Sequence, residues 1–278
     1  MNNQEDLSDN TQIRNIIAVV SGKGGVGKST VTANLALTLK QQGYQIGILD
    51  ADVYGPSQGK MLGIKDNIKP DITKKNGKTW YLPVNAYGIA VMSMAFLASE
   101  RTPMVWRGPM ASGAFQQMLL QTWWGQLDIL LVDMPPGTGD IQLTLSQKAS
   151  LKGSIVVTTP QDIALLDAQR AIEMFKKVNI PVTGIVENMS VHICSQCGHQ
   201  EAIFGHGGAK RLASHYAVKL LGSLPLNRTV REHGDQGCPV VMAEDQYAKI
   251  YTDIAVNITD ELNKASDLFY PPKINIDQ

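Results

Sequence analysis

Residues 22 to 30 limit the possible folds of this chain more than any other part of its sequence. They read Gly22-Lys23-Gly24-Gly25-Val26-Gly27-Lys28-Ser29-Thr30. The stretch contains the complete phosphate-loop pattern, in which glycines let backbone amides face phosphate oxygens, a lysine reaches the β- and γ-phosphates, and a hydroxyl holds magnesium. An apolar run at 16–20 precedes the loop, and a helical apolar pattern at 31–39 follows it. We therefore predict a strand, a loop and a helix that bind a nucleotide, with Lys28 on phosphate and Ser29 on Mg2+.

Apolar runs and helical segments alternate along the rest of the chain. The runs lie at 46–49, 89–92, 129–132, 154–157, 182–186 and 220–224, and the helical patterns at 109–121, 162–178, 207–216 and 247–266. This alternation predicts an α/β fold: a single P-loop NTPase domain with a mostly parallel sheet flanked by helices on both faces. We place the domain at 15–270, between a disordered polar tail at 1–14 and a loose tail at 271–278, and expect a polar excursion at 65–78.

Acidic side chains follow two of the predicted strands. Asp50 and Asp52 come after the run at 46–49, and Asp133 comes after the run at 129–132. Either of these two carboxylates, Asp50 or Asp52, is suited to meet the γ-phosphate or its attacking water. Asp133 stands where a Walker B aspartate organises magnesium, directly or through water. Either Asp50 or Asp52 is also suited to cap the helix that follows.

A segment rich in proline and glycine comes directly after Asp133. It reads Pro135-Pro136-Gly137-Thr138-Gly139-Asp140. Stiff prolines followed by residues that bend easily suit a switch loop that senses the γ-phosphate, with the Gly137 amide as its contact. An inert turn is the alternative.

Cys194 and Cys197 provide half of a metal site. A tetrahedral zinc ion or an iron–sulfur cluster generally takes four ligands. Two chains related by a two-fold axis supply four thiolates, so we predict an iron–sulfur cluster that bridges a homodimer. A redox-active or unliganded pair remains an alternative, and Cys238 is expected to pack as a small apolar residue. A zinc site within one chain also remains open, completed by His192, His199 or His206.

Composition narrows the possible partners. The 25 basic and 25 acidic side chains cancel, which leaves no net positive charge to support nucleic-acid binding. The sequence has no apolar run long enough to span a bilayer and no signal-peptide pattern at its amino terminus. We expect a cytoplasmic protein that binds neither nucleic acid nor membrane.

Lys23 is not required by an ordinary phosphate loop. A lysine at this place resembles the deviant P-loop of the MinD/ParA-like ATPase family. The resemblance implies that ATP is the nucleotide and is hydrolysed, that Lys23 reaches the partner's phosphates across a nucleotide-sandwich homodimer, and that Asp52 is the switch aspartate. An exposed loop lysine without such a role is the alternative.

Further motifs resemble the Mrp/ApbC group of iron–sulfur cluster carriers within that family. They are Val53-Tyr54-Gly55-Pro56-Ser57, Trp106-Arg107-Gly108-Pro109, Met134-Pro135-Pro136-Gly137-Thr138-Gly139-Asp140, Glu187-Asn188-Met189-Ser190, Cys194-Ser195-Gln196-Cys197-Gly198 and Ile203-Phe204-Gly205. The resemblance implies that Asn188 contacts adenine and that Cys194 and Cys197 of each subunit hold a labile [4Fe-4S] cluster. The cluster would pass from a cluster donor to apo iron–sulfur proteins under control of ATP. Trp106 and Arg107 are expected to pack and to precede a helix that starts at Pro109.

Three other functions compete with this one. A positioning ATPase similar to MinD or ParA grips membrane or DNA, but residues 260–278 show no lysine-rich amphipathic helix. An electron donor similar to nitrogenase iron protein uses widely separated single cysteines. A zinc-stabilised P-loop enzyme that acts on a small molecule would be distinguished by metal analysis.

Overall fold

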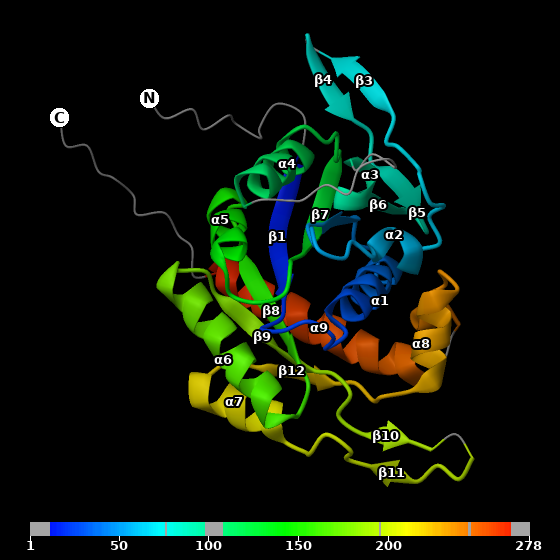
Figure 1. Ribbon diagram of the computed structural model, residues 1–278, viewed down its shortest axis with the longest axis vertical. Helices are drawn as coiled ribbons and strands as arrows, with labels where there is room; N and C mark the ends of the chain where they lie inside the picture. Colours follow the sequence, from blue (N-terminus) through cyan, green and yellow to red (C-terminus); the bar gives the residue numbers. More distant parts are fainter. Residues whose placement is uncertain (1–11, 76, 98–107, 195, 244–245, 268–278) are drawn as a thin grey trace, which may run out of the picture.

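The computed structural model describes residues 12–75, 77–97, 108–194, 196–243 and 246–267, and a twisted eight-stranded sheet forms its centre (Figure 1). The strands of this sheet are β1 (Gln12–Val20), β2 (Ile46–Asp50), β5 (Val84–Ala86), β6 (Ile89–Ser93), β7 (Gln126–Asp133), β8 (Gly153–Thr158), β9 (Val182–Glu187) and β12 (Leu220–Ser223). Their order is β12-β9-β8-β1-β7-β2-β6-β5. All neighbours pair in parallel except β5, which is antiparallel to β6.

The central strands are buried on both faces, which explains their continuous apolar sequences. Residues 16–20 of β1 and 129–132 of β7 are all buried, as expected for strands covered by helices on both sides. The predicted α/β fold with a mostly parallel sheet is confirmed. Strand β1 begins earlier than expected, because Gln12 and Ile13 pair with Gln126 and Leu127 of β7. Residues 12–14, which the predicted tail included, therefore belong to the sheet, whereas 1–11 and 268–278 lie outside the described residues.

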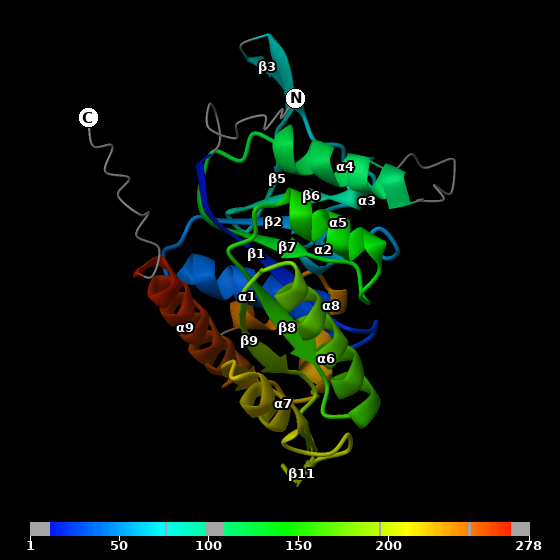
Figure 2. The same ribbon diagram turned by 90° about the vertical axis from the view of Figure 1, so that its left-hand side faces the viewer.

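Helices cover both faces of the sheet (Figure 2). Helices α1 (Lys28–Gln41) and α9 (Gln246–Asp267) lie on one face, and α4 (Gly108–Leu120), α5 (Asp140–Lys148) and α6 (Asp162–Lys177) lie on the other. Helix α7 (Gly208–Tyr216) lies beside α6. The remaining helical segments are α2 (Gln58–Met61), α3 (Met94–Leu97), α8 (Arg228–Asp235) and the 3-10 turn η2 (Val240–Ala243).

Most residues of helix α1 are buried, and the helix fixes the loop that precedes it. Val31, Leu35 and Leu39 are buried, as are the small residues between them. The helix packs between the sheet and α9, whose Tyr251 and Ile254 are also buried. A helix held on two sides gives the phosphate loop a rigid support.

Two small hairpins project from opposite ends of the molecule (Figure 1). One consists of β3 (Ile72–Lys75) and β4 (Lys78–Tyr81), and it overlaps the predicted polar excursion. The other consists of β10 (His192–Ile193) and β11 (Gln200–Glu201) and carries the cysteine pair at its turn. Trp106 and Arg107, expected to pack before α4, lie outside the described residues. None of the helices in the described part of the chain has both the length and the apolarity to cross a membrane.

Candidate functional site

The phosphate loop and two aspartates lie at one edge of the sheet because their strands are neighbours. Strand β7 lies between β1 and β2, and all three run in parallel. In the register of the sheet, Asp133 is beside Asp50 on one side and beside Val19 on the other. The carboxyl ends of parallel strands are the usual ligand edge of such sheets. The structure therefore brings together the loop and the acidic residues that the sequence predicted for phosphate and magnesium.

Lys28 is buried in an acidic cluster. Its side chain is 6% exposed, its Nζ forms an ion pair and hydrogen bond with Asp133 Oδ1, and Asp52 Oδ2 lies 3.6 Å from Nζ. Nζ also lies 3.4 Å from Ser29 Oγ. Burial alone lowers the pKa of Lys28, but Asp133, followed by Asp52 and Asp50, outweighs this effect and raises the pKa above its ordinary value. Lys28 is thus a fixed counter-charge for the acidic residues.

Gln58 holds the other oxygen of Asp133. Its Nε2 donates to Asp133 Oδ2 at 2.8 Å and to the carbonyl oxygen of Ser29 at 3.0 Å. Gln58 is fully buried at the start of α2, and no sequence pattern pointed to it.

Asp50 caps α2 from the neighbouring strand. Its Oδ2 accepts hydrogen bonds from the backbone N–H groups of Ser57 and Gln58 at 2.9 and 3.1 Å and from the Ser93 hydroxyl at 3.0 Å. Burial and the nearby Asp133 carboxylate raise the pKa of Asp50 to about 7. The predicted helix-capping alternative is correct for Asp50. Asp52 instead accepts from its own turn, through the N–H groups of Tyr54 and Gly55 at 3.2 and 3.3 Å.

The phosphate loop borders a cavity of about 190 Å³. The cavity is lined by Ser21, Gly24, Gly25, Gly27, Lys28, Ser29, Thr30, Asp52, Ser57, Met61 and Pro136. Two loop residues support the cavity without lining it: Val26 is buried, and a Cβ on Gly22 would lie 2.2 Å from the backbone of Asp167 in α6. Gly27 needs its lack of a side chain most, because its φ is +81° and a Cβ would lie 2.2 Å from Asn188 Nδ2.

The donor atoms around this cavity fit a hydrated magnesium ion. The Ser29 hydroxyl and the Asp52 and Asp133 carboxylates are oxygen ligands of the kind that Mg2+ takes. Gln58 Oε1 and Ser21 Oγ are buried, and neither has a hydrogen-bond partner among the described residues. No group of three or more His, Cys, Asp or Glu side chains in the described chain could hold a metal by itself. Such a site matches an ion that is bound through waters and nucleotide phosphates rather than by a protein cage.

A second cavity of about 390 Å³ continues from the first, since both include Gly27, Thr30, Ser57 and Met61. Asn188 lies at the junction, where its Nδ2 donates to the Val26 carbonyl oxygen at 2.8 Å. The remaining lining is Lys60, Met189, Pro225, Leu226, Asn227, Val230, Arg231, Gly234 and Asp235. Many of these belong to α8 or to the loop before it, which the sequence did not identify.

Lys23 and Gly137 make contacts other than those expected of the loaded state. Lys23 is half-buried, and its Nζ lies 3.3 Å from Gln161 Oε1, so it does not line the cavity of its own loop. The Gly137 N–H donates to the Ser21 carbonyl oxygen at 2.9 Å, with φ at +99°. For the predicted contact with the γ-phosphate, the Gly137 N–H must first release the Ser21 carbonyl oxygen.

The cysteine pair lies at the tip of the hairpin formed by β10 and β11. Cys197 is exposed and Cys194 partly buried, and both are free thiols. The Gly198 N–H donates to the Cys194 carbonyl oxygen at 2.9 Å, and Gly198 has φ of +71°. Backbone N–H groups of Cys197 and Gln196, in that order, lower the pKa of the Cys194 thiol.

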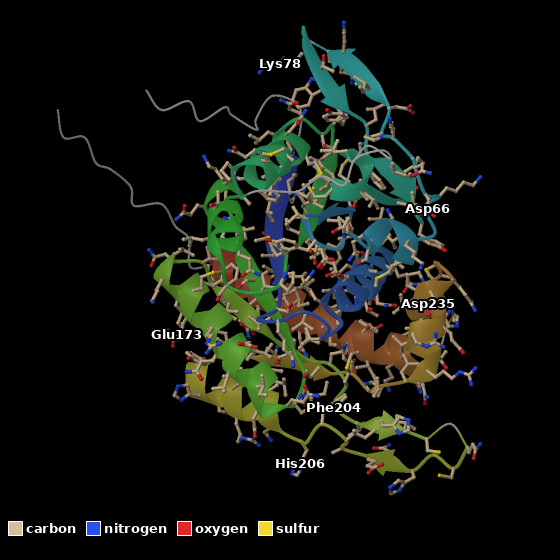
Figure 3. All side chains as sticks on the ribbon, viewed as in Figure 1. Asp66, Lys78, Glu173, Phe204, His206 and Asp235 are labelled. Atoms are coloured by element: carbon tan, nitrogen blue, oxygen red, sulfur yellow. The ribbon has the colours of Figure 1, made fainter. Side chains whose placement is uncertain are left out.

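Among the described residues, no group of three or more His, Cys, Asp or Glu side chains is arranged to hold a metal ion, and this includes the cysteine pair with its neighbours His192, His199 and His206. Figure 3 shows His206 near the end of the hairpin that joins the body of the protein, away from the turn. Cys238 is partly buried after α8, where its carbonyl oxygen lies 3.0 Å from His233 Nδ1.

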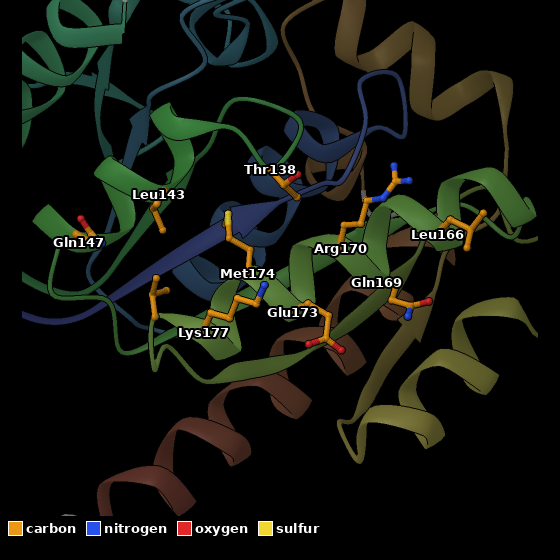
Figure 4. A pocket seen from close by; sticks show the side chains of 10 residues that line it. Thr138, Leu143, Gln147, Leu166, Gln169, Arg170, Glu173, Met174 and Lys177 are labelled. Carbon is orange, nitrogen blue, oxygen red and sulfur yellow. The ribbon is translucent and has the colours of Figure 1, made fainter.

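A separate cavity of about 650 Å³ lies between α5 and α6 (Figure 4). Its apolar lining includes Leu143, Leu166 and Met174, and Thr138 of the predicted switch loop lies at its edge. None of the predicted site residues lines it.

Comparisons with known proteins agree with this geometry. Residues 12–259 match the family described as ParA: NUBPL iron-transfer P-loop NTPase. The iron-sulfur cluster carrier protein of Pseudomonas fragi is 56% identical over 255 residues, covering 91% of this chain and 88% of the relative. The carrier of Escherichia coli K12 is 54% identical over 252 residues, covering 90% and 67%. The mouse iron-sulfur cluster transfer protein NUBPL is 48% identical over 259 residues, covering 92% and 80%.

Solved structures show the same fold. The nucleotide-binding protein from Archaeoglobus fulgidus, in complex with ADP, superposes with a TM-score of 0.70 at 39% identity, covering 81% of this chain and 87% of that one. The cell division ATPase MinD of Pyrococcus furiosus superposes with a TM-score of 0.62 at 22% identity, covering 89% and 99%, which concerns the fold alone. The resemblance to Mrp-type carriers is thereby confirmed, and the chain belongs to the NUBPL iron-transfer group of ParA-like P-loop NTPases.

Proposed function

We propose that this protein is a magnesium-dependent ATPase that carries a [4Fe-4S] cluster as cargo between the subunits of a homodimer. It would receive the cluster from a donor and pass it to apo iron–sulfur proteins. The names of its relatives and the ADP bound to the Archaeoglobus fulgidus protein support this function. The observation that carries it is the pair of thiols at the tip of a projecting hairpin, in a chain that also holds a complete phosphate site.

The residues of the phosphate site have separate tasks in this proposal. The amides of residues 22–30 and the Lys28 ammonium bind the phosphates, because partial and full positive charges converge there. Ser29 and Asp133 hold Mg2+, which neutralises charge on the phosphate oxygens. Asp52 orients the attacking water, and Asn188 contacts the adenine from the junction of the two cavities.

Lys23 acts on the second subunit in this proposal. Its Nζ contacts Gln161 Oε1 at 3.3 Å, and the side chain does not line the cavity of its own loop, so it is available to a partner's nucleotide. A lysine supplied in trans stabilises charge that develops on the phosphates, as arginine fingers do. The Gly137 amide would bind the γ-phosphate after releasing the Ser21 carbonyl oxygen.

The cluster proposal rests on the number and exposure of the thiols. Cys194 and Cys197 supply two thiolates per chain, and a four-iron cluster takes four. Both thiols lie at the tip of a projecting hairpin, where they would be accessible to a second copy of the chain. The lowered pKa of Cys194 favours the thiolate, which is the form that binds metal.

Anaerobic reconstitution with iron and sulfide tests the carrier function. Wild-type protein is compared with Cys194→Ala, Cys197→Ala and the matched control Cys238→Ala, with iron, sulfide, zinc and subunit number measured for each. We expect about four irons per dimer in the wild type and the control, and loss in the two hairpin variants. Zinc without iron in the wild type would reject the bridging cluster. So would a full complement of iron in either Cys194→Ala or Cys197→Ala. Transfer of the cluster to an apo-ferredoxin is the functional readout.

A further inference from the structure

Gln58 makes contacts that tie the segment after Asp52 to the magnesium site. Its Nε2 donates to Asp133 Oδ2 at 2.8 Å and to the Ser29 carbonyl oxygen at 3.0 Å. Both partners are acceptors, so the orientation of the amide is determined by the contacts themselves. One side chain thus joins α2, the phosphate loop and the end of β7.

The position of Gln58 is fixed by Asp50. The carboxylate of Asp50 accepts from the backbone N–H groups of Ser57 and Gln58, which holds the first turn of α2 against the end of β2. Gln58 is fully buried, and it lies outside the lining of the phosphate cavity. It is therefore placed to act on Asp133 rather than on a nucleotide.

We propose that Gln58 is a positioning residue for magnesium: it occupies Asp133 Oδ2, so that Oδ1 alone faces Lys28 in the free protein and the hydrated ion in the loaded one. This inference rests on the proposed ATPase function and adds a residue to it. Without the glutamine, the Asp133 carboxylate is free to turn both of its oxygens toward the Lys28 ammonium. A displacement of α2 would also break the hydrogen bond between Gln58 and Asp133 Oδ2. The segment after Asp52 is thereby coupled to metal binding.

The second polar atom of Gln58 supports this role. Oε1 is buried and has no hydrogen-bond partner among the described residues, and a buried acceptor without a donor is costly. The waters that Mg2+ usually keeps are O–H donors. A water held by the ion would satisfy Oε1 once loading brings that water within reach of Gln58, which lies outside the cavity lining in the free protein.

The experiment separates magnesium dependence from nucleotide binding in general. Affinity for a non-hydrolysable ATP analogue is measured with Mg2+ and again with EDTA, for wild type, Gln58→Met and Gln58→Leu. Methionine keeps the length of the side chain without its polar atoms, and leucine provides a second shape if one variant folds poorly. Gln117→Leu is the control, because it removes a glutamine amide that donates to Tyr81 Oη at 2.9 Å from α4, outside both nucleotide cavities.

We expect both Gln58 variants to bind the analogue in EDTA within about twofold of wild type. With Mg2+ their affinity should be about tenfold lower, the effect of losing one hydrogen bond to a charged group. Wild-type magnesium enhancement in either folded variant would overturn the inference. So would equal weakening with and without Mg2+, or failure of both variants to fold, since either shows a structural role only. If wild type itself gains nothing from Mg2+, the magnesium assignment of the proposed function fails, and this inference with it.

Discussion

Replacing Lys28 with methionine should destabilise the nucleotide-free protein as well as abolish nucleotide binding. Lys28 is the cation in contact with Asp133, whose carboxylate is fully buried, and Asp52 lies 3.6 Å from the same ammonium. Methionine fills most of the volume of the lysine stem, but among the described residues it leaves the Asp133 carboxylate with Gln58, a neutral donor, as its hydrogen-bond partner. The variant therefore buries a carboxylate without a counter-charge.

The cost can be worked from these contacts. Breaking one side of a buried ion pair destabilises by about 3–5 kcal/mol. We expect about 3 kcal/mol here, because Gln58 still donates to Asp133. For a domain of this size, that loss lowers Tm by roughly 6 to 12 °C.

Urea and thermal unfolding of the free protein at pH 8 measure this effect. The double variant Lys28→Met/Asp133→Asn should recover most of the lost stability, because it removes the unpaired carboxylate together with the lysine. Neither variant should bind ATP. A single variant as stable as wild type at pH 8 would refute the view that Lys28 balances the acidic cluster.

Three further changes have expected outcomes. Lys23→Ala should keep its ATP affinity, measured by calorimetry, because Lys23 contacts Gln161 and does not line its own phosphate cavity. Its steady-state ATP hydrolysis should fall by roughly a thousandfold. Hydrolysis at the wild-type rate would exclude a role in trans. Gly27→Ala should destabilise by about 2 kcal/mol or more and weaken ATP binding, since φ is +81° and a Cβ would collide with Asn188; unchanged melting would contradict this. The folded-state pKa of Asp50, about 7, lies above its ordinary 3.8, so unfolding free energy should fall by up to about 1.4 kcal/mol per pH unit as pH rises to 7 and level off above it. Asp50→Asn should remove that slope in denaturant titrations between pH 5 and 7.

The central sheet and the phosphate loop could be predicted because their physical causes are local. Strands buried on both faces are continuous apolar runs, and a loop that surrounds phosphate needs glycines and a lysine at fixed spacing. Asp133 was identifiable for the same reason, since it ends such a run. The prediction missed the first three residues of β1. Gln12 to Arg14 alternate in exposure and do not form an apolar run, so they did not show the pattern of a buried strand.

Other parts of the site depend on contacts between distant segments and leave no pattern in the sequence. Gln58 contacts Asp133 only after β2, β7 and α2 have packed together, so the sequence around residue 58 contains no pattern that predicts this contact. Helix α8 contributes to the second cavity, yet none of its residues is buried and its sequence is strongly polar. The hydrogen bond between Gly137 and Ser21 joins loops more than 100 residues apart.

The order of the strands also determines how far apart the two carboxylates lie. Asp50 and Asp133 are neighbours in the register of β2 and β7, and the Ala51 N–H donates to the Asp133 carbonyl oxygen at 2.9 Å. The spacing of the two carboxylates is thus set by the backbone ladder, at about 4.8 Å between strands, and not by the shape of any surface loop. Substitutions on the outer faces of the helices can accumulate without changing that spacing. The fold that carries this ladder is shared with the MinD of Pyrococcus furiosus at 22% identity.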